Sequence, residues 1–222
     1  MADWRMFEKD VGQLVELFGY KAEVTKASGD GGVDVMARRG DRTVAIQCKL
    51  YQGRVGVKAV IEVAASQRLH GATDCILLTT GMFTKDALKL GRQGDVKMIG
   101  GPEILTLCKQ KRIVLRSASF LVTSTTAYQL SEPEQMVGRQ GPLILSDIRV
   151  SGLHAKIVRN GLNLGVIDQN STNGTKLNGE RLTPGKTYRL GYGDELEFAH
   201  IRCKVSMYKS EVLAPPVKVL RF

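Results

Sequence analysis

The residues best suited to chemistry in this sequence lie in the stretch 29–49, GDGGVDVMARRGDRTVAIQCK. It contains Asp34 and, after twelve intervening residues, the triplet Gln47-Cys48-Lys49. A carboxylate, an amide oxygen and the backbone carbonyl of Cys48 are hard oxygen ligands that suit Mg²⁺, and a lysine stabilises negative charge on a phosphoryl group. The set could therefore hydrolyse a phosphodiester with the help of a metal. An Asp and a Gln-x-Lys also occur together by chance, so the spacing leaves a non-catalytic hairpin open.

A β-hairpin would position these residues. Residues 33–37 and 44–50 alternate in the manner of half-buried strands, and the polar residues 38–43 between them form a turn. The apolar residues of the second strand share one face, which leaves Gln47 and Lys49 together on the other face.

The turn also predicts the register of the hairpin. If it centres between Gly40 and Asp41, paired residue numbers sum to 81, so Asp34 faces Gln47 directly and Lys49 diagonally. A slip by one residue would turn the carboxylate onto the apolar face, so the hydrophobic pattern favours this register.

Basic residues accompany the hairpin. We expect those of the turn to lie beside the site and, with two that follow it, to contact DNA phosphates; the set is Arg38, Arg39, Arg42, Arg54 and Lys58. The alternative is a solvated turn. The whole chain carries a formal charge of +10 with a pI near 9.6, which favours a polyanionic partner, although many proteins without one are mildly basic.

The first half of the chain is predicted to be an α/β domain. An amphipathic helix begins it, with Trp4, Phe7, Val11, Leu14 and Phe18 at steps of three and four residues. Three strands, a helix, a strand, a helix, a strand and a helix follow. Strands joined by crossover helices imply a mixed sheet covered on both sides, with the apolar run CILLTT as a central strand.

The segments FEKDVGQLVELFGYKAEV, SGDGGVDVMA, VAIQCKLY and LLTTGMFTKDA, in this order, resemble the catalytic domain of Mrr-type restriction endonucleases. These enzymes belong to the PD-(D/E)xK nuclease superfamily, and the resemblance covers residues 7–107. It implies a restriction-endonuclease-like core, Mg²⁺ or Mn²⁺ as cofactor, and Asp34, Gln47 and Lys49 as the catalytic trio. Glu8 is implied as a further metal or water ligand, whereas by itself it could lie on a solvated helix face. Gln47 stands where the superfamily more often has Glu, which should weaken metal binding.

Beyond residue 113, helical periodicity gives way to short strands separated by turns, which predicts an all-β second half. Arg139, Ser151 and Asn173 fall on turns and could form an oxyanion pocket. His154 near Ser151 could suggest a base and a nucleophile. We favour a packed, hydrogen-bonding His154, because the spacing shows no third, orienting acid.

The motifs GR, SxxHA and STNGT, within residues 118–210, are similar to those of forkhead-associated (FHA) domains. The similarity implies an antiparallel β-sandwich that binds phosphothreonine through Arg139, Ser151 and Asn173, with Thr172 shaping the binding loop. The remaining motif residues are implied to be structural, namely Gly138, His154 and Gly174. Gly152 replaces the basic or amide residue that often follows the serine, which would lower affinity.

The expected organisation is an endonuclease domain (1–112), a short linker (113–117), an FHA-like sandwich (118–210) and a C-terminal tail (211–222). We predict a type IV restriction-like DNA endonuclease in restriction, defence or repair, targeted by phosphothreonine proteins and able to form a homodimer. The alternative is a DNA-binding scaffold that does not cut. No signal peptide or membrane span is evident, and four scattered cysteines suggest buried thiols in a reducing, cytoplasmic compartment: Cys48, Cys75, Cys108 and Cys203.

Overall fold

The computed structural model describes residues 4–25 and 32–209. The glycine-rich turn at 28–32 and the predicted tail therefore lie largely or wholly outside the described residues. Two compact units divide the chain, one up to Thr106 and one spanning Leu107–Ala214. In the described ranges no helix is both long and apolar enough to cross a membrane.

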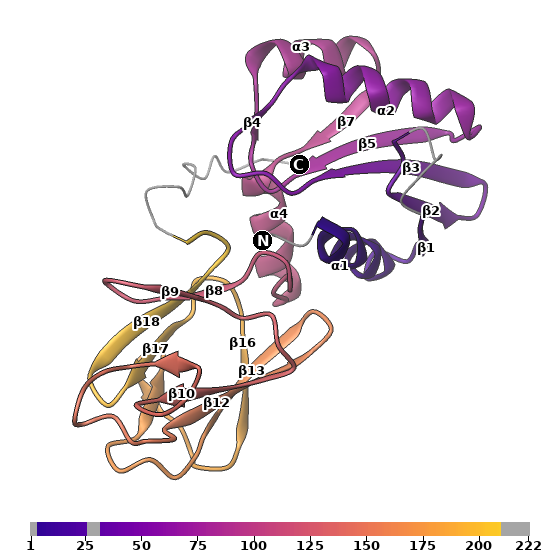
Figure 1. Ribbon diagram of the computed structural model, residues 1–222. Helices are drawn as coiled ribbons and strands as arrows, with labels where there is room; N and C mark the ends of the chain where they lie inside the picture. Colours follow the sequence, from indigo (N-terminus) through magenta and orange to yellow (C-terminus); the bar gives the residue numbers. More distant parts are fainter. Residues whose placement is uncertain (1–3, 26–31, 210–222) are drawn as a thin grey trace. The chain divides into compact units, whose positions relative to one another are not determined.

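The first unit contains a five-stranded mixed sheet in the order β1-β2-β3-β5-β7 (Figure 1). The strands β1 to β3 pair antiparallel, and β3, β5 and β7 run parallel to one another. The bounds are β1 Lys21–Val24, β2 Val35–Arg39, β3 Arg42–Lys49, β5 Asp74–Thr79 and β7 Val96–Ile99, with a separate parallel pair of β4 Arg54–Val55 and β6 Met82–Phe83. The predicted mixed sheet is confirmed, and the run CILLTT forms β5 between two neighbours.

Helices cover both faces of this sheet, α1 on one and α2 with α3 on the other (Figure 1). Their bounds are α1 Trp4–Glu16, α2 Val57–Leu69, α3 Lys85–Gln93 and α4 Gly101–Lys111. The strand expected at 44–50 was predicted to be half-buried, but Val44, Ala45 and Ile46 are all buried. The reason is that β3 is the middle strand of the sheet and both of its faces carry helices.

The predicted hairpin register is confirmed over β2 and β3. The pairs run from Val35–Ile46 to Arg39–Arg42, and each pair of residue numbers sums to 81. Gly40 at the turn has a φ of 57°, in the left-handed region that glycine adopts without a steric penalty.

The second unit is a β-sandwich of two sheets, ordered β11-β10-β12-β13-β16 and β15-β14-β17-β18-β8-β9. Its pairings are antiparallel except for the short β10–β11 pair. The bounds are β8 Phe120–Val122, β9 Ala127–Gln129, β10 Glu134–Gly138, β11 Leu143–Ile144, β12 Ala155–Asn160, β13 Asn163–Asp168, β14 Thr175–Leu177, β15 Glu180–Arg181, β16 Thr187–Leu190, β17 Glu195–Phe198 and β18 Ile201–Ser206. The predicted all-β second half is confirmed.

The segment expected as a linker, 113–117, is packed into the second unit. Ile113, Val114 and Leu115 are buried. The Val114 amide donates to the Leu162 carbonyl at 2.9 Å, and the Leu115 amide donates to a tyrosine hydroxyl of the same unit at 3.0 Å. An apolar Ile-Val-Leu run is stabilised by burial in the sandwich, so it does not act as a free connection.

All four cysteines lie among the described residues and are free thiols. Cys75, Cys108 and Cys203 are buried, as the sequence predicts, and Cys48 is partly exposed. Burial raises the pKa of the Cys203 thiol to about 12, so it behaves as a small apolar side chain.

Candidate nuclease site and candidate phosphopeptide site

Asp34 lies one residue before β2, where the regular pairing with β3 ends. Its backbone nitrogen donates to the Ile46 carbonyl at 2.9 Å, although Val35 already pairs with Ile46. Two residues opposite one is the arrangement of a β-bulge, which re-aims a side chain. The Asp34 carboxylate accepts a hydrogen bond from the backbone nitrogen of Cys48 at 2.6 Å. The expected direct pairing of Asp34 with Gln47 is therefore replaced by a contact with the main chain of β3.

Gln47 is 3 % exposed, and its amide is held from helix α2. The Nε2 group donates to Oε2 of Glu62 at 3.3 Å. The other amide atom, Oε1, is buried and has no hydrogen-bond partner among the residues that the structure describes. A buried acceptor in this state is costly unless another group binds it. A divalent cation, which takes amide oxygens as ligands, fits this position.

Lys49 and Gln47 share a partner. The Nζ group of Lys49 lies 3.6 Å from Oε2 of Glu62, and Lys58 lies 3.9 Å from Oε1 of the same carboxylate. The prediction from sequence missed Glu62. A weak signal was available, because Lys58 and Glu62 stand four residues apart on a predicted helix, the spacing of an ion pair.

Glu8 on α1 is buried, so it is not part of a solvated helix face. Burial raises the pKa of the Cys48 thiol well above its ordinary value, and the negative charges of Asp34 and Glu8 raise it further, while Lys49 opposes them. Glu8 and Asp34 thus act electrostatically on the same residue of β3. Asp34 lies at the Cys48 end of this strand, where its carboxylate binds the backbone.

In the described part of the chain, no three Asp, Glu, His or Cys side chains group as a ready metal-binding cluster. A cation at Asp34 would therefore need donors beyond such a cluster, and the predicted ligands Gln47, the Cys48 carbonyl and Glu8 stay a prediction. Mg²⁺ suits such a sparse donor set, because it usually keeps several waters and is held by one or two carboxylates plus substrate phosphates.

The basic turn lies at the opposite end of the hairpin from Gln47. At about 3.3 Å per residue, the six residues from Asp41 to Gln47 span roughly 20 Å. The expectation that the turn lies beside the site is therefore wrong, because the hairpin opens, rather than closes, at Asp34 and Gln47.

The three arginines of that turn make contacts within their own unit. Arg42 donates to both carboxylate oxygens of Asp74 at 3.0 and 3.2 Å. The Arg39 guanidinium lies 4.6 Å from the centre of the Tyr20 ring. Arg38 pairs at 3.7 Å with a glutamate of β1, on the surface. Arg54 and Lys58, by contrast, follow the Lys49 end of β3 and are exposed. A role for any of the five in DNA binding stays a prediction.

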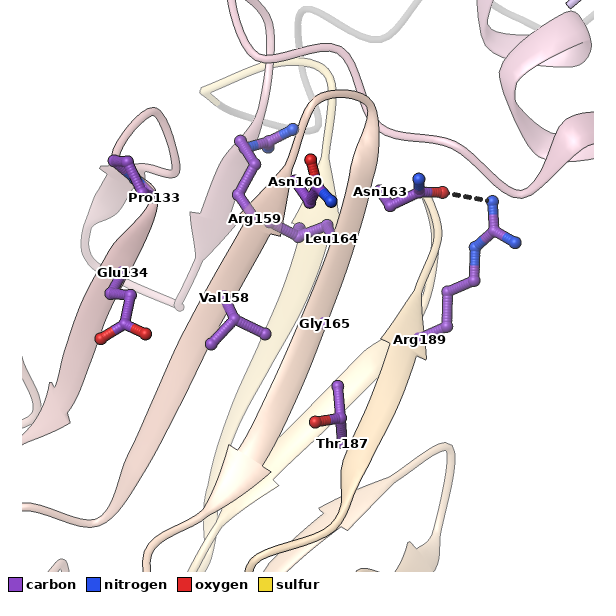
Figure 2. A pocket seen from close by; sticks show the side chains of 10 residues that line it. All are labelled: Pro133, Glu134, Val158, Arg159, Asn160, Asn163, Leu164, Gly165, Thr187 and Arg189. Carbon is purple, nitrogen blue, oxygen red and sulfur yellow. Dashed lines mark hydrogen bonds between the residues drawn. The ribbon is translucent and has the colours of Figure 1, made fainter.

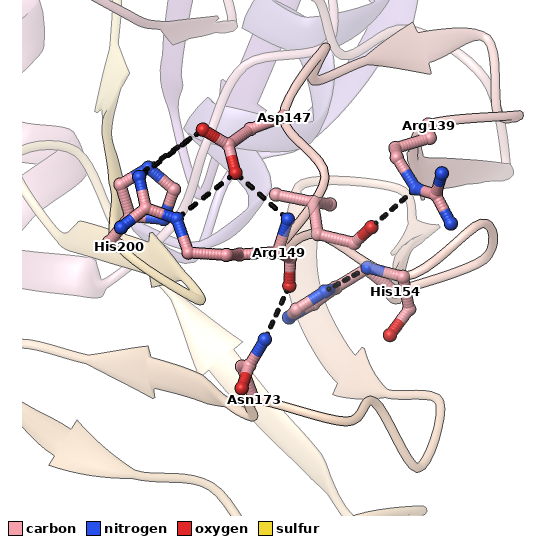
Figure 3. A network of polar contacts seen from close by, with 8 residues as sticks. Arg139, Asp147, Arg149, His154, Asn173 and His200 are labelled. Carbon is pink, nitrogen blue, oxygen red and sulfur yellow. Dashed lines mark hydrogen bonds and ion pairs between the residues drawn. The ribbon is translucent and has the colours of Figure 1, made fainter.

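In the second unit, Arg139 and Ser151 are joined through the backbone. Nε of Arg139 donates to the Val150 carbonyl at 2.7 Å, and its backbone nitrogen donates to the Ser151 carbonyl at 3.1 Å (Figure 3). The side chain is exposed, and its two terminal nitrogens make no hydrogen bond to the described residues. The guanidinium is thus fixed at one nitrogen and leaves two donors for an anion.

The STNGT loop contacts the loop that carries Ser151. The Thr172 backbone nitrogen donates to Oγ of Ser151 at 3.1 Å, and the two hydroxyls lie 3.5 Å apart. The Asn173 amide donates to the Arg149 carbonyl at 2.7 Å (Figure 3). The structure thus brings together two of the loops that carry the predicted residues.

The side chain of Arg149 stabilises the loop to which it belongs. Its guanidinium pairs with Asp147 at 3.2 Å and lies 2.6 Å from a ring nitrogen of His200 (Figure 3). The hydrogen bonds from Arg149 lower the pKa of Asp147 to about 2. Asp147 therefore stays ionised over the physiological range, which keeps the carbonyl of Arg149 in place for Asn173.

Asp168, which the sequence analysis did not single out, anchors the STNGT loop from below. Its buried carboxylate accepts hydrogen bonds from the Ser171 hydroxyl and the Thr175 hydroxyl, each at 2.6 Å, and from the Ser171 backbone nitrogen at 3.1 Å. Burial would raise the pKa of Asp168, but these hydrogen bonds lower it below its ordinary value. A short polar loop that follows a strand-terminal aspartate is a recognisable signal for such an anchor.

His154 is fully buried and joins two loops. The Ser151 backbone nitrogen donates to Nδ1 at 3.1 Å, so the neutral ring carries its proton on Nε2, which faces the Gly174 carbonyl at 3.1 Å. Burial lowers the pKa of His154. Both ring nitrogens bind backbone atoms, which leaves none to activate the serine.

Two glycines of the motif are required by geometry. A Cβ on Gly138 would collide with the Gly152 carbonyl, and Gly174 has a φ of 79°, in the left-handed region, where a Cβ would also lie only 2.6 Å from the Arg181 guanidinium. A larger residue at Gly138 would push against the backbone of the Ser151 loop, and one at Gly174 would strain its own backbone.

A pocket of about 600 Å³ lies elsewhere on the sandwich, over β10, β12, β13 and β16 (Figure 2). Its rim includes Arg189, which donates to Asn163 at 2.7 Å. None of the residues predicted from sequence lines it.

Comparison with known proteins follows this division of the chain. A family model described as a restriction endonuclease, Mrr_cat, matches residues 1–108, and an FHA domain model matches residues 136–199. The chain carries an Mrr-type restriction endonuclease domain followed by an FHA domain. These two matches support a nuclease domain joined to a phosphothreonine-binding domain.

A curated protein and several solved structures are similar to parts of this chain. An oxoglutarate dehydrogenase inhibitor of Corynebacterium jeikeium (strain K411) is 31% identical over 138 residues, which is 60% of this chain and 90% of that protein. A structure from work on phosphothreonine-dependent FHA domain interactions is 29% identical, with a TM-score of 0.38, over 41% of this chain and 98% of that one. A crystal structure of a protein of unknown function is 22% identical, with a TM-score of 0.46, over 50% of this chain and 68% of its own.

Proposed function

We propose that this protein is a divalent-metal-dependent DNA endonuclease of the type IV restriction class, directed to its place of action by phosphothreonine proteins that bind its FHA domain. Restriction, defence or repair of DNA is the setting that such a pair of domains suits. The observation that carries the proposal is the buried Oε1 of Gln47, which has no hydrogen-bond partner among the described residues and lies in the strand that also contains Cys48 and Lys49.

The residues of the nuclease site divide the work. Asp34, Oε1 of Gln47 and the carbonyl of Cys48 would hold the cation, and Glu8 would hold a water. When bound, the cation polarises a phosphoryl oxygen and lowers the pKa of the attacking water. Lys49 exchanges its contact with Glu62 for the scissile phosphate and stabilises the negative charge that develops there.

Plasmid cleavage tests this assignment. Wild-type protein should cut DNA with Mg²⁺ or Mn²⁺ and not with EDTA, and Asp34→Ala and Lys49→Ala should each abolish cutting. Lys89→Ala, on the exposed side of α3, is the matched control and should cut normally. Wild-type-like cleavage by either site variant would refute the roles given to these residues. Methylated and unmethylated plasmids, compared side by side, test the type IV class.

The FHA domain should bind a phosphothreonine peptide and not its unphosphorylated form, because a phosphate of charge about −2 needs a fixed guanidinium. In the full chain, Arg139→Ala and Arg139→Lys should both abolish or strongly weaken binding, since an ammonium cannot replace a two-pronged donor. Ser151→Ala should cost less, about tenfold to a hundredfold. Arg202→Ala, an exposed arginine paired at 3.6 Å with Glu197, is the control. Binding that survives Arg139→Ala would show that the phosphate sits elsewhere.

A scaffold is the second candidate. Gln47 in place of a carboxylate and the lack of a three-carboxylate cluster in the described ranges favour a domain that binds DNA without cutting it. The relative named as an inhibitor is consistent with an FHA protein that acts by binding. DNA binding with no cleavage under any divalent cation would support this reading. Homodimerisation and a cytoplasmic location stay predictions.

A further inference from the structure

Glu62, a residue of helix α2, contacts both Gln47 and Lys49 of the Gln-x-Lys triplet. One oxygen of its carboxylate contacts Nε2 of Gln47 at 3.3 Å and Nζ of Lys49 at 3.6 Å, and the other lies 3.9 Å from Nζ of Lys58. The side chain is 37 % exposed, so it remains accessible to solvent. No other acidic residue lies in α2.

The contact with Gln47 settles which way the amide points. A carboxylate only accepts hydrogen bonds, so the nitrogen of the amide must face Glu62 and the oxygen must face away. Gly32 lies beside this amide, and a side chain there would crowd it, since a Cβ on Gly32 would lie 3.1 Å from Nε2 of Gln47. If the amide turned over, a donor would stand where the oxygen now stands, and a donor repels a cation.

The contact with Lys49 adds a second effect. Lys49 carries the charge that a phosphate would meet, and Glu62 holds its ammonium beside Gln47 instead of letting it extend into solvent. Because the pair is partly exposed, a phosphate can compete for the ammonium.

We propose that Glu62 is a positioning residue of the nuclease site, which fixes the Gln47 amide with its oxygen available to a divalent cation and holds Lys49 next to it. The cation rests on the proposed function, whereas the orientation of the amide does not. Gln47 has an amide at the position where the nuclease superfamily more often has a carboxylate. Glu62 thus brings a carboxylate next to this position from helix α2.

A metal-free measurement tests the orientation. The side-chain amide signals of Gln47 are identified in the NMR spectrum of the full chain by their loss in Gln47→Glu. We expect a downfield shift and slow exchange in wild type, loss of both in Glu62→Ala, and retention in Glu62→Gln, whose own oxygen still accepts. Alanine is a good helix former, so the variant should fold. Unchanged signals in Glu62→Ala would overturn the proposal.

A Mn²⁺ titration without DNA, followed by electron paramagnetic resonance, tests the consequence. Glu62→Ala should bind Mn²⁺ at least tenfold more weakly than wild type, and Glu62→Gln should stay within about threefold. Glu23→Gln removes an equivalent exposed charge, paired at 3.7 Å with an arginine, and should change nothing. Equal affinity in wild type and Glu62→Ala would also overturn the proposal. If wild type lacked Mn²⁺ binding that depends on Asp34, the proposed function would fail, while the amide signals would still report the role of Glu62 in orienting Gln47.

Discussion

At the scale of single residues, the charge of the nuclease site depends on the hydrogen bond between Gln47 and Glu62. The neutral amide of Gln47 is the donor and the carboxylate of Glu62 is the acceptor. The sequence leads us to expect that Gln47→Glu would strengthen metal binding by restoring a carboxylate. The structure qualifies this expectation, because the new carboxylate would stand about where Nε2 now meets Glu62 at 3.3 Å. Two like charges at this distance favour protonation of one of them.

The first prediction follows from that pair. Gln47→Glu should bind Mg²⁺ or Mn²⁺ with an affinity that rises steeply between pH 6 and pH 8, because a shared proton must leave. Gln47→Glu combined with Glu62→Gln restores a donor opposite an acceptor and should bind more tightly than wild type at neutral pH. Calorimetry at the two pH values measures both. Equal or weaker binding by the double variant would count against Gln47 as a metal ligand.

A second residue-scale prediction concerns His154. Burial lowers its pKa in the folded state, so below about pH 6.5 the unfolded chain binds a proton that the folded chain does not. Stability from this group is therefore complete above pH 6.5 and declines as the pH falls, by at most about 1.4 kcal/mol per pH unit. Hydrogen exchange of residues 137–175 at pH 7.5 and 5.5 should show less protection at the lower pH, and His154→Gln should reduce that difference. A variant with the wild-type pH dependence would assign the effect to another group.

At the scale of elements, both sites depend on where a strand stops. The pairing of β2 with β3 becomes irregular at Asp34, and this irregularity directs the carboxylate to the backbone of Cys48. In the sandwich, β13 ends at Asp168, and that carboxylate organises the loop that carries Asn173. In each case an aspartate at the end of a strand accepts a hydrogen bond from the backbone, Asp34 from Cys48 of β3 and Asp168 from Ser171 of the STNGT loop.

Asp168→Asn provides the element-scale prediction. An asparagine presents a donor on one side, so it cannot accept all three hydrogen bonds that the carboxylate accepts from Ser171 and Thr175. We expect a loss of about 1–3 kcal/mol in the stability of the FHA domain and about tenfold weaker phosphopeptide binding. Thermal unfolding and peptide titration measure the two effects, with exposed Glu180→Gln as the control. Binding and stability equal to wild type would mean that the loop holds its shape without Asp168.

At the scale of the whole molecule, the excess of positive charge is shared by both domains. Residues 1–112 carry 18 basic against 13 acidic residues, and residues 113–222 carry 14 against 9. Neither domain is a purely basic arm. The arginines of the β2–β3 turn already contact other side chains of their own unit. The net charge therefore overstates the number of basic side chains that can bind DNA phosphates near the site.

Salt dependence of DNA binding gives the last prediction. Affinity, measured by fluorescence anisotropy, should fall linearly on a log–log plot against salt, and Arg54→Ala and Lys58→Ala should each lower the slope by about 1. Arg42→Ala should leave the slope nearly unchanged, because that side chain is held by Asp74. Binding that is independent of salt, or absent, would remove the proposed DNA contacts. A larger effect from Arg42 than from Arg54 would place the DNA at the turn.

The sequence by itself determined the two families, the class of each fold and the hairpin register. These depend on short-range patterns: the alternation along a strand has a period of two, so a slip by one residue would expose the apolar face. Only the tertiary structure decided that a bulge turns Asp34 toward Cys48, that the turn arginines lie far from Gln47, and that 113–117 packs into the sandwich. It also decided that Glu62 binds Gln47 and Lys49, because a residue on a helix reaches a strand only through the packing of that helix on the sheet, which no local pattern encodes.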